Sequence, residues 1–275
     1  MKSIALRPRC FDWCGGALLA IMLMTPSLAD AEAHVPPGEA TWESVARVDW
    51  RDGLSEAVSE QANPGGIEVV PDPEDASRKV LRAAIARNEN FTHVANGSPR
   101  AEVLFREPAS FAQGSDYLLQ WSTYLPRNFE FDGKQMVIVS QIHPSGKSGS
   151  PTLALTLLGT NYYISTRGGM QVQRTTAGAK LCCAENDRGH WVYWTLRYIP
   201  DDSGQQSLTQ LWKNGVSVFH SEHVANAYLG DQHSYLKVGL YKSGWLKEPS
   251  DVEVQTMFYG PVSILRRKTN LTRNP

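Results

Sequence analysis

Short segments with a side-chain period of two recur along the sequence and are separated by turn residues. Trp191–Tyr198 alternates cleanly, and the segments Leu208–Lys213 and Val216–Phe219 flank the dipeptide Asn214-Gly215. An Asn-Gly pair supplies the positive φ angles of a tight hairpin, and alternation is typical of strands with one buried face. The sequence has no helical period sustained over several turns. The pattern predicts an all-β chain of antiparallel strands, a sandwich or jelly roll.

Length and composition favour a single large core. The chain has 275 residues, of which 41% are hydrophobic. We expect one domain over residues 44–268, after a poorly ordered leader at 30–43 and before a tail at 269–275. Further strands are expected at Val45–Trp50, Gly66–Val70, Lys79–Ile85, Tyr117–Leu125, Gln135–His143, Thr152–Leu157, Tyr162–Thr166 and Val252–Leu265.

The N-terminus has the pattern of a secretory signal peptide. Lys2, Arg7 and Arg9 precede an apolar run over residues 15–24, and small residues up to Ala29 suit a signal peptidase. The run is short for a bilayer span, so we expect residues 1–29 to be removed. The mature protein is expected to be soluble, and secreted or periplasmic.

Charge and cysteine content exclude several classes of protein. Without residues 1–29 the chain has 24 basic and 27 acidic residues, which favours neither nucleic acid nor a membrane surface as partner. The remaining cysteines, Cys182 and Cys183, exclude a disulfide scaffold and a cysteine zinc site. We interpret them as structural, with a vicinal disulfide as the less favoured alternative. We expect a monomer without a cofactor, although calcium held by loop carbonyls stays open.

One segment near the C-terminus combines alternation with polar side chains that a core does not need. In Tyr235–Tyr241 the residues Tyr235, Lys237, Gly239 and Tyr241 share one face of a strand, and leucine and valine form the other. We expect the aliphatic face in the core, and the glycine to leave room above the polar face. An ordinary solvated face has the same pattern, because antiparallel sheets usually expose one polar face.

Two other segments carry polar faces with the same period. In the first, Arg100, Glu102 and Arg106 share a face. In the second, Gln141 and His143 share a face at the end of an apolar run. A surface charge ladder and a solvated histidine are the simpler interpretations of each segment alone. Three such faces on three predicted strands favour a site that binds and acts on a ligand.

The three segments together resemble the strand motifs of the jelly-roll alginate lyases, in the same order along the chain. They are Arg100-Ala-Glu-Val103, Gln141-Ile-His143 and Tyr235-Leu-Lys-Val-Gly-Leu-Tyr241. The spacing of Lys237 and Tyr241 also resembles that of heparin lyase I and the glucuronan lyases. The resemblance implies a polysaccharide lyase on a β-jelly roll, a concanavalin A-like sandwich of two antiparallel sheets. Leu104 and Lys242-Ser243 depart from the alginate lyase pattern, and these departures favour a resemblance to the glucuronan and heparin lyase group.

The resemblance implies β-elimination on a uronic-acid polymer, in which a base removes the C5 proton beside the C6 carboxylate. Donors aimed at that carboxylate stabilise the charge that develops. Gln141 and Arg100 are the candidates for this role, with His143 assisting. Tyr241 is the candidate acid, base or both, and nearby Lys237 is expected to lower the pKa of its phenol.

Stereochemistry leaves two routes open. In mannuronate and glucuronate the C5 hydrogen and the C4 oxygen lie on the same side, so Tyr241 alone can move the proton. In guluronate and iduronate they lie on opposite sides, which requires His143 as base and Tyr241 as acid. Four further residues are predicted to bind the anionic polysaccharide: Glu102, Arg106, Lys242 and Trp245. Glu102 can instead orient the arginines, and Trp245 can belong to the core.

Other classes fit the sequence less well. A non-catalytic carbohydrate-binding module explains the aromatic and basic residues but not the histidine and tyrosine. A retaining glycoside hydrolase of this architecture needs acids at alternate positions on one strand, and the sequence has no such arrangement. We therefore predict a polysaccharide lyase that acts on alginate or glucuronan, with a heparin-type glycosaminoglycan as the alternative substrate.

Overall fold

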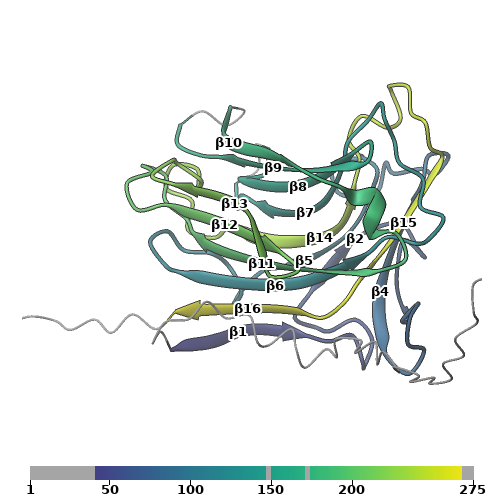
Figure 1. The fold of residues 1–275 in the computed structure, drawn as a ribbon, viewed down its shortest axis with the longest axis horizontal. Helices are drawn as coiled ribbons and strands as arrows, with labels where there is room; N and C mark the ends of the chain where they lie inside the picture. Colours follow the sequence, from purple (N-terminus) through teal and green to yellow (C-terminus); the bar gives the residue numbers. More distant parts are fainter. Residues whose placement is uncertain (1–40, 147–149, 171–173, 268–275) are drawn as a thin grey trace, which may run out of the picture. The chain divides into compact units, whose positions relative to one another are not determined.

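Sixteen strands form two antiparallel sheets in the computed structural model, which describes residues 41–146, 150–170 and 174–267 (Figure 1). Within these ranges the one helical element is the 3-10 turn η2 (Ala184–Asp187). The part of the chain that the structure describes therefore contains no helix able to cross a membrane. The all-β jelly-roll prediction is confirmed. The predicted signal peptide, residues 30–40 of the leader and the tail at 269–275 lie outside the described residues.

The larger sheet has nine strands in the order β13-β12-β11-β6-β15-β4-β3, with β16 paired to both β6 and β1. Its strands are β1 (Trp42–Val48), β3 (Ile67–Pro71), β4 (Lys79–Ala86), β6 (Tyr117–Tyr124), β11 (Trp191–Ile199), β12 (Leu208–Lys213), β13 (Val216–Glu222), β15 (Val254–Tyr259) and β16 (Val262–Arg267). The predicted hairpin at Asn214-Gly215 joins β12 to β13, and Asn214 has the positive φ that such a turn requires.

The smaller sheet has seven strands in the order β10-β9-β8-β7-β14-β5-β2. Its strands are β2 (Ser59–Gln61), β5 (Arg100–Phe105), β7 (Val137–His143), β8 (Leu153–Leu158), β9 (Asn161–Arg167), β10 (Thr175–Leu181) and β14 (Tyr235–Tyr241). The three segments with predicted polar faces are thus adjacent strands, with β14 between β7 and β5. Their pairing brings residues from three distant parts of the sequence together.

Several strand boundaries differ from the prediction. Gly260 and Pro261 divide the predicted last strand into β15 and β16, because proline lacks the N–H that a sheet ladder needs. Strand β1 begins at Trp42, inside the predicted leader. Strands β2 and β10 were not predicted, since three residues and a Thr-Ala-Gly-rich segment give little alternation. Cys182 and Cys183 form a vicinal disulfide, which was the less favoured of the two interpretations of these cysteines.

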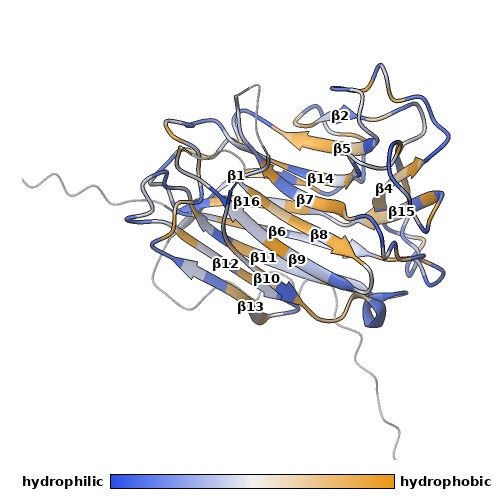
Figure 2. Ribbon diagram, turned by 90° about the horizontal axis from the view of Figure 1, so that it is seen from above, coloured by the Kyte–Doolittle hydropathy of each residue, from blue (hydrophilic) through white to orange (hydrophobic). Residues whose placement is uncertain are grey.

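The core lies between the inner faces of the two sheets. Leu236, Val238 and Leu240 of β14 belong to it, as the alternation predicted, and so does Ile142 of β7. Hydrophobic residues run along β5 and β8 in Figure 2. The opposite face of β14 is therefore the outer face of the seven-stranded sheet, and this face carries the candidate site.

Gly239 was predicted to leave room above the polar face, but the structure shows that it allows β14 and β5 to approach each other closely. A Cβ atom at this position would lie 2.1 Å from the carbonyl oxygen of Ala101 on β5, and the residue has a φ of 133°. A glycine is required here because no side chain fits between the two backbones. The register between β14 and β7 shifts between Val238 and Tyr241 at the same point. This irregularity sets where Tyr241 stands along the sheet.

Candidate active site

Strand pairing places the predicted residues side by side on the outer face. On one side of β14, Lys237 lies opposite Gln141 and Tyr235 lies opposite His143. On the other side, Tyr241 lies opposite Arg100 of β5. The sequence could predict that these residues share faces, but not this register, because the pairing is long-range. The face is continuous across the three strands.

Glu102 is the centre of a buried polar network. Its carboxylate accepts hydrogen bonds from Arg100 Nη1 at 3.3 Å, from Lys237 Nζ at 3.4 Å and from the amide of Gln141. Glu102 is 1% exposed, and Lys237 and Gln141 are each 2% exposed. The prediction of Glu102 as a substrate-binding residue is therefore corrected, since it orients its neighbours from below the surface. Two cations share one carboxylate, so the network has a net charge of about +1.

Gln61 of the short edge strand β2 completes this network. Its Oε1 accepts hydrogen bonds from Arg100 Nη1 at 3.1 Å and from Lys237 Nζ at 2.9 Å. Both partners can only donate, so the amide oxygen must face them. Sequence reasoning missed this residue, because a three-residue strand offers no period from which a face could be inferred.

Arg100 lies against the ring of Tyr241. Its guanidinium carbon is 4.3 Å from the ring centroid, and the same group donates to Ser98, Asn96, Gln61 and Glu102. The cation in contact with Tyr241 is thus Arg100, whereas the Lys237 ammonium is bonded to Gln61 and Glu102. A guanidinium at this distance interacts with the π electrons of the phenol ring. Tyr241 itself is partly exposed and accessible to a ligand.

His143 is a neutral imidazole whose Nδ1 faces a backbone carbonyl. Its Nδ1 lies 2.8 Å from the carbonyl oxygen of Pro144. A carbonyl can only accept, so Nδ1 carries the proton and Nε2 keeps its lone pair. Burial, followed by the positive charges of Lys237, Arg100 and Arg106, lowers the pKa of His143 to about 4, against the opposing effect of the hydrogen bond to the Pro144 carbonyl.

Arg106 and Tyr235 extend the face beyond His143. The exposed Arg106 guanidinium lies 5.0 Å from the Tyr235 ring centroid, and the Tyr235 and His143 rings are 5.5 Å apart. Arg106 lies just past the end of β5 and adds a third positive side chain to Arg100 and Lys237. The prediction that Arg106 binds an anionic polymer is compatible with this exposed position.

The structure places Lys242 and Trp245 away from this face, and their prediction as substrate-binding residues is corrected. Both side chains are 0% exposed. Strand β14 ends at Tyr241, and alternation turns Lys242 toward the interior. Lys242 Nζ donates to Asp132 Oδ2 at 2.7 Å and to the carbonyl oxygen of Gln135 at 3.2 Å. A polysaccharide cannot contact either side chain.

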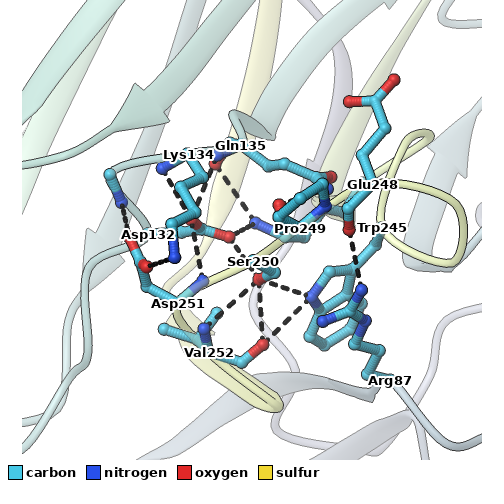
Figure 3. Close-up of polar contacts among 12 residues, drawn as sticks. Arg87, Asp132, Lys134, Gln135, Trp245, Glu248, Pro249, Ser250, Asp251 and Val252 are labelled. Carbon is cyan, nitrogen blue, oxygen red and sulfur yellow. Dashed lines mark hydrogen bonds and ion pairs between the residues drawn. The ribbon is translucent and has the colours of Figure 1, made fainter.

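Asp132 connects this second network to the loop after β14. Figure 3 shows the Ser250 hydroxyl between the Asp132 carboxylate and the indole of Trp245, whose Nε1 is 2.9 Å from Ser250 Oγ. Burial raises the pKa of Asp132, but hydrogen bonds from Lys242, Ser250 and the backbone of Lys134 and Gln135 outweigh it, so the pKa lies far below its usual range. This network joins the loops that follow β6 and β14.

Comparison with known proteins identifies the family. The family model of the polysaccharide lyases matches residues 40–262. The chain belongs to the polysaccharide lyase family. It is therefore an enzyme of the lyase class, as the sequence predicted. A search of the curated proteins gives no match.

Solved structures of other polysaccharide lyases share the fold. The endo-β-1,4-glucuronan lyase of the fungus Trichoderma reesei aligns with a TM-score of 0.64 and 16% identity, over 81% of this chain and 95% of that one. The family 7 alginate lyase A1-II' aligns with a TM-score of 0.52 and 12% identity, over 74% of this chain and 84% of that one. A variant of alginate lyase Aly36B with a bound alginate trisaccharide aligns with a TM-score of 0.51 and 12% identity, over 82% and 98%. At these identities the likeness establishes the jelly roll of this polysaccharide lyase and no finer property.

Among residues 41–146, 150–170 and 174–267, no three His, Cys, Asp or Glu side chains are grouped to hold a metal ion. The expectation that the enzyme needs no metal stays a prediction.

Proposed function

We propose that this polysaccharide lyase cleaves a uronic-acid polymer by β-elimination on the outer face of β5, β7 and β14. The observation that carries the proposal is the surplus of positive charge around Glu102, directly beside the accessible phenol of Tyr241. A buried network with a net charge of about +1 attracts a carboxylate. It also stabilises the enolate-like charge that develops when the C5 proton leaves. A neutral polysaccharide would gain nothing from this arrangement.

The residues divide the chemistry between them. Tyr241, as phenolate, takes the C5 proton while the electron pair moves toward the C6 carboxylate. The C4=C5 double bond then forms as the C4–O bond breaks, and the phenol returns the proton to the departing oxygen. Arg100 supports the phenolate from beneath the ring, Lys237 keeps the field at the carboxylate positive, and Gln141 donates to Glu102 and so holds it in place. No water is added to either product.

The cation beside Tyr241 favours the route in which Tyr241 acts alone. Arg100 lies against the Tyr241 ring, whereas His143 pairs with Tyr235 at the other end of β14. We therefore assign both proton transfers to Tyr241, and contact with the polymer to the neutral imidazole of His143. Same-side elimination requires mannuronate or glucuronate. We therefore propose glucuronan or mannuronate-rich alginate as the substrate, and the likeness to a glucuronan lyase supports the first.

The experiment follows the absorbance of an unsaturated uronate during incubation with glucuronan, polymannuronate, polyguluronate and heparin. We expect growth with glucuronan or polymannuronate, and a loss of about 10²–10⁴ in rate in Tyr241→Phe, the scale of one acid–base group. His143→Asn serves as the matched control and should keep more activity than Tyr241→Phe. Cleavage of polyguluronate alone, with His143→Asn as inactive as Tyr241→Phe, would overturn the single-residue route.

We further propose that the enzyme is exported. Export is supported by the basic, apolar and small-residue order of residues 1–29. N-terminal sequencing of the protein recovered from outside the cytoplasm tests it, and an intact N-terminus at Met1 would contradict it.

A further inference from the structure

Gln61 differs from every other member of the site network in three respects. It comes from the edge strand β2, it is a neutral group between two cations, and it is partly exposed while Glu102 and Lys237 are not. Its position is therefore at the boundary between the buried network and the surface that a polymer would contact.

The two ends of the Gln61 amide have different surroundings. The oxygen is occupied by Arg100 and Lys237, at 3.1 and 2.9 Å. The Nε2 group donates to no acceptor among the hydrogen bonds of the described residues, and it does not belong to their buried unsatisfied atoms. An amide N–H that is partly exposed beside two cations is a donor available to an anionic ligand.

The residue type at position 61 also sets the charge of the network. Arg100 and Lys237 contribute two positive charges and Glu102 one negative charge, which leaves about one positive charge uncompensated. A carboxylate at position 61 would keep both hydrogen bonds and would form ion pairs with both cations. It would remove the surplus charge, however, and would turn the free donor into an acceptor that repels a carboxylate.

We propose that Gln61 is a specificity-determining residue, whose amide keeps the network positive and donates an N–H to the carboxylate of a uronate in the substrate. The inference deepens the proposed function and rests on it for the identity of the ligand. It adds a substrate-contacting group on β2, a strand outside the three motif-bearing strands.

Two substitutions separate this role from a purely structural one. Gln61→Glu keeps the acceptor for Arg100 and Lys237 but cancels the surplus charge. Gln61→Met keeps the length and the surplus charge but removes both the acceptor and the donor. The proposal predicts weaker ligand binding for Gln61→Glu than for Gln61→Met. A structural role as acceptor predicts the reverse order, with Gln61→Glu close to the wild type.

The test measures binding of glucuronate and mannuronate tetrasaccharides by calorimetry, in a Tyr241→Phe background so that turnover does not interfere. We expect Gln61→Glu to raise the dissociation constant about tenfold to a hundredfold, the effect of one unit charge a few ångströms from the ligand in a partly buried site. The salt dependence of binding should also become weaker. Gln61→Met should lie between this variant and the parent.

Controls make both outcomes interpretable. Gln210→Glu places the same change in a partly buried amide on β12, in the other sheet, and should leave binding unchanged. Thermal unfolding of Gln61→Glu should occur at or above the temperature of the parent. Equal binding by the parent and Gln61→Glu, or weaker binding by Gln61→Met than by Gln61→Glu, would overturn the inference.

Failure of the inference and failure of the proposed function have different readouts. Growth of ultraviolet absorbance in the wild type, together with unchanged binding by Gln61→Glu, retains elimination and removes the role of Gln61. Absence of growth on all four polymers, together with the predicted order of affinities, removes elimination and retains Gln61 as an anion-specificity residue. No binding of either tetrasaccharide by the parent would overturn the inference directly.

Discussion

Two buried lysines five residues apart have different surroundings, and the difference separates structure from function. Lys242 faces one carboxylate, Asp132, together with a carbonyl oxygen, so its charge is balanced. Lys237 shares Glu102 with Arg100, and the neutral amide of Gln61 completes its contacts. Burial lowers the pKa of both lysines, against the opposing effect of the neighbouring carboxylate. Burial alone therefore does not distinguish the two sites, but charge balance does.

Removal of Lys242, the lysine whose charge is balanced, should have the largest effect on the free energy of unfolding. Lys242→Met leaves Asp132 buried without a cation, and we expect a loss of about 3–5 kcal/mol in the free energy of unfolding. Urea denaturation followed by tryptophan fluorescence measures it. A double variant, Asp132→Asn with Lys242→Met, should recover part of the loss. A cost no larger than that of Lys237→Met would contradict the assignment of this network to stability.

Lys237→Met should show the opposite profile. Glu102 keeps Arg100 as its partner, so the free energy of unfolding should stay within about 1 kcal/mol of the wild type. The value of kcat/KM on the cleaved polymer should fall by about 10²-fold, the scale of one preorganised electrostatic group. Ultraviolet absorbance and urea denaturation on the same preparation measure both. Retained activity with lost stability would reverse the proposed assignment.

The two lysines should also differ in their effect on the pKa of His143, because only Lys237 lies near the imidazole. We expect the imidazole of His143 to titrate near pH 4 in the wild type. NMR measures this through the His143 resonance, which is assigned by its absence from the spectrum of His143→Asn. Lys237→Met should raise this pKa toward 6.5, while Lys242→Met should leave it unchanged. Because the folded-state pKa lies below 6.5, the contribution of His143 makes the protein less stable as pH falls from about 6.5 to about 4. Equal shifts in the two variants would contradict the proposed geometry.

The smallest effect is expected for the hydroxyl that joins Asp132 to Trp245. Ser250→Ala removes this link, but Trp245 Nε1 keeps the carbonyl oxygen of Val252 at 3.1 Å and Asp132 keeps Lys242. The free energy of unfolding should fall by about 1 kcal/mol, with kcat/KM unchanged. A large loss of activity without loss of stability would connect this network to catalysis.

Side-chain alternation predicted the polar faces because a strand's period is local. The grouping of Lys237 with Tyr241, and of Gln141 with His143, follows from it directly. The charge balance of the site does not, since it depends on which strands pair and in which register. Gln61 enters the site only through the pairing of β2 with β5. Lys242 and Trp245 were misassigned because the site was extended past Tyr241, where β14 ends.

The mass of the cleavage products distinguishes elimination from hydrolysis. Elimination adds no water, so mass spectrometry of glucuronan or polymannuronate digests should show chains with a new non-reducing end that are one water lighter than hydrolysis products. Tyr241→Phe should form them about 10²–10⁴ times more slowly at equal protein concentration. Fully hydrated products, or unsaturated products formed equally by Tyr241→Phe, would contradict elimination at the positively charged face around Glu102.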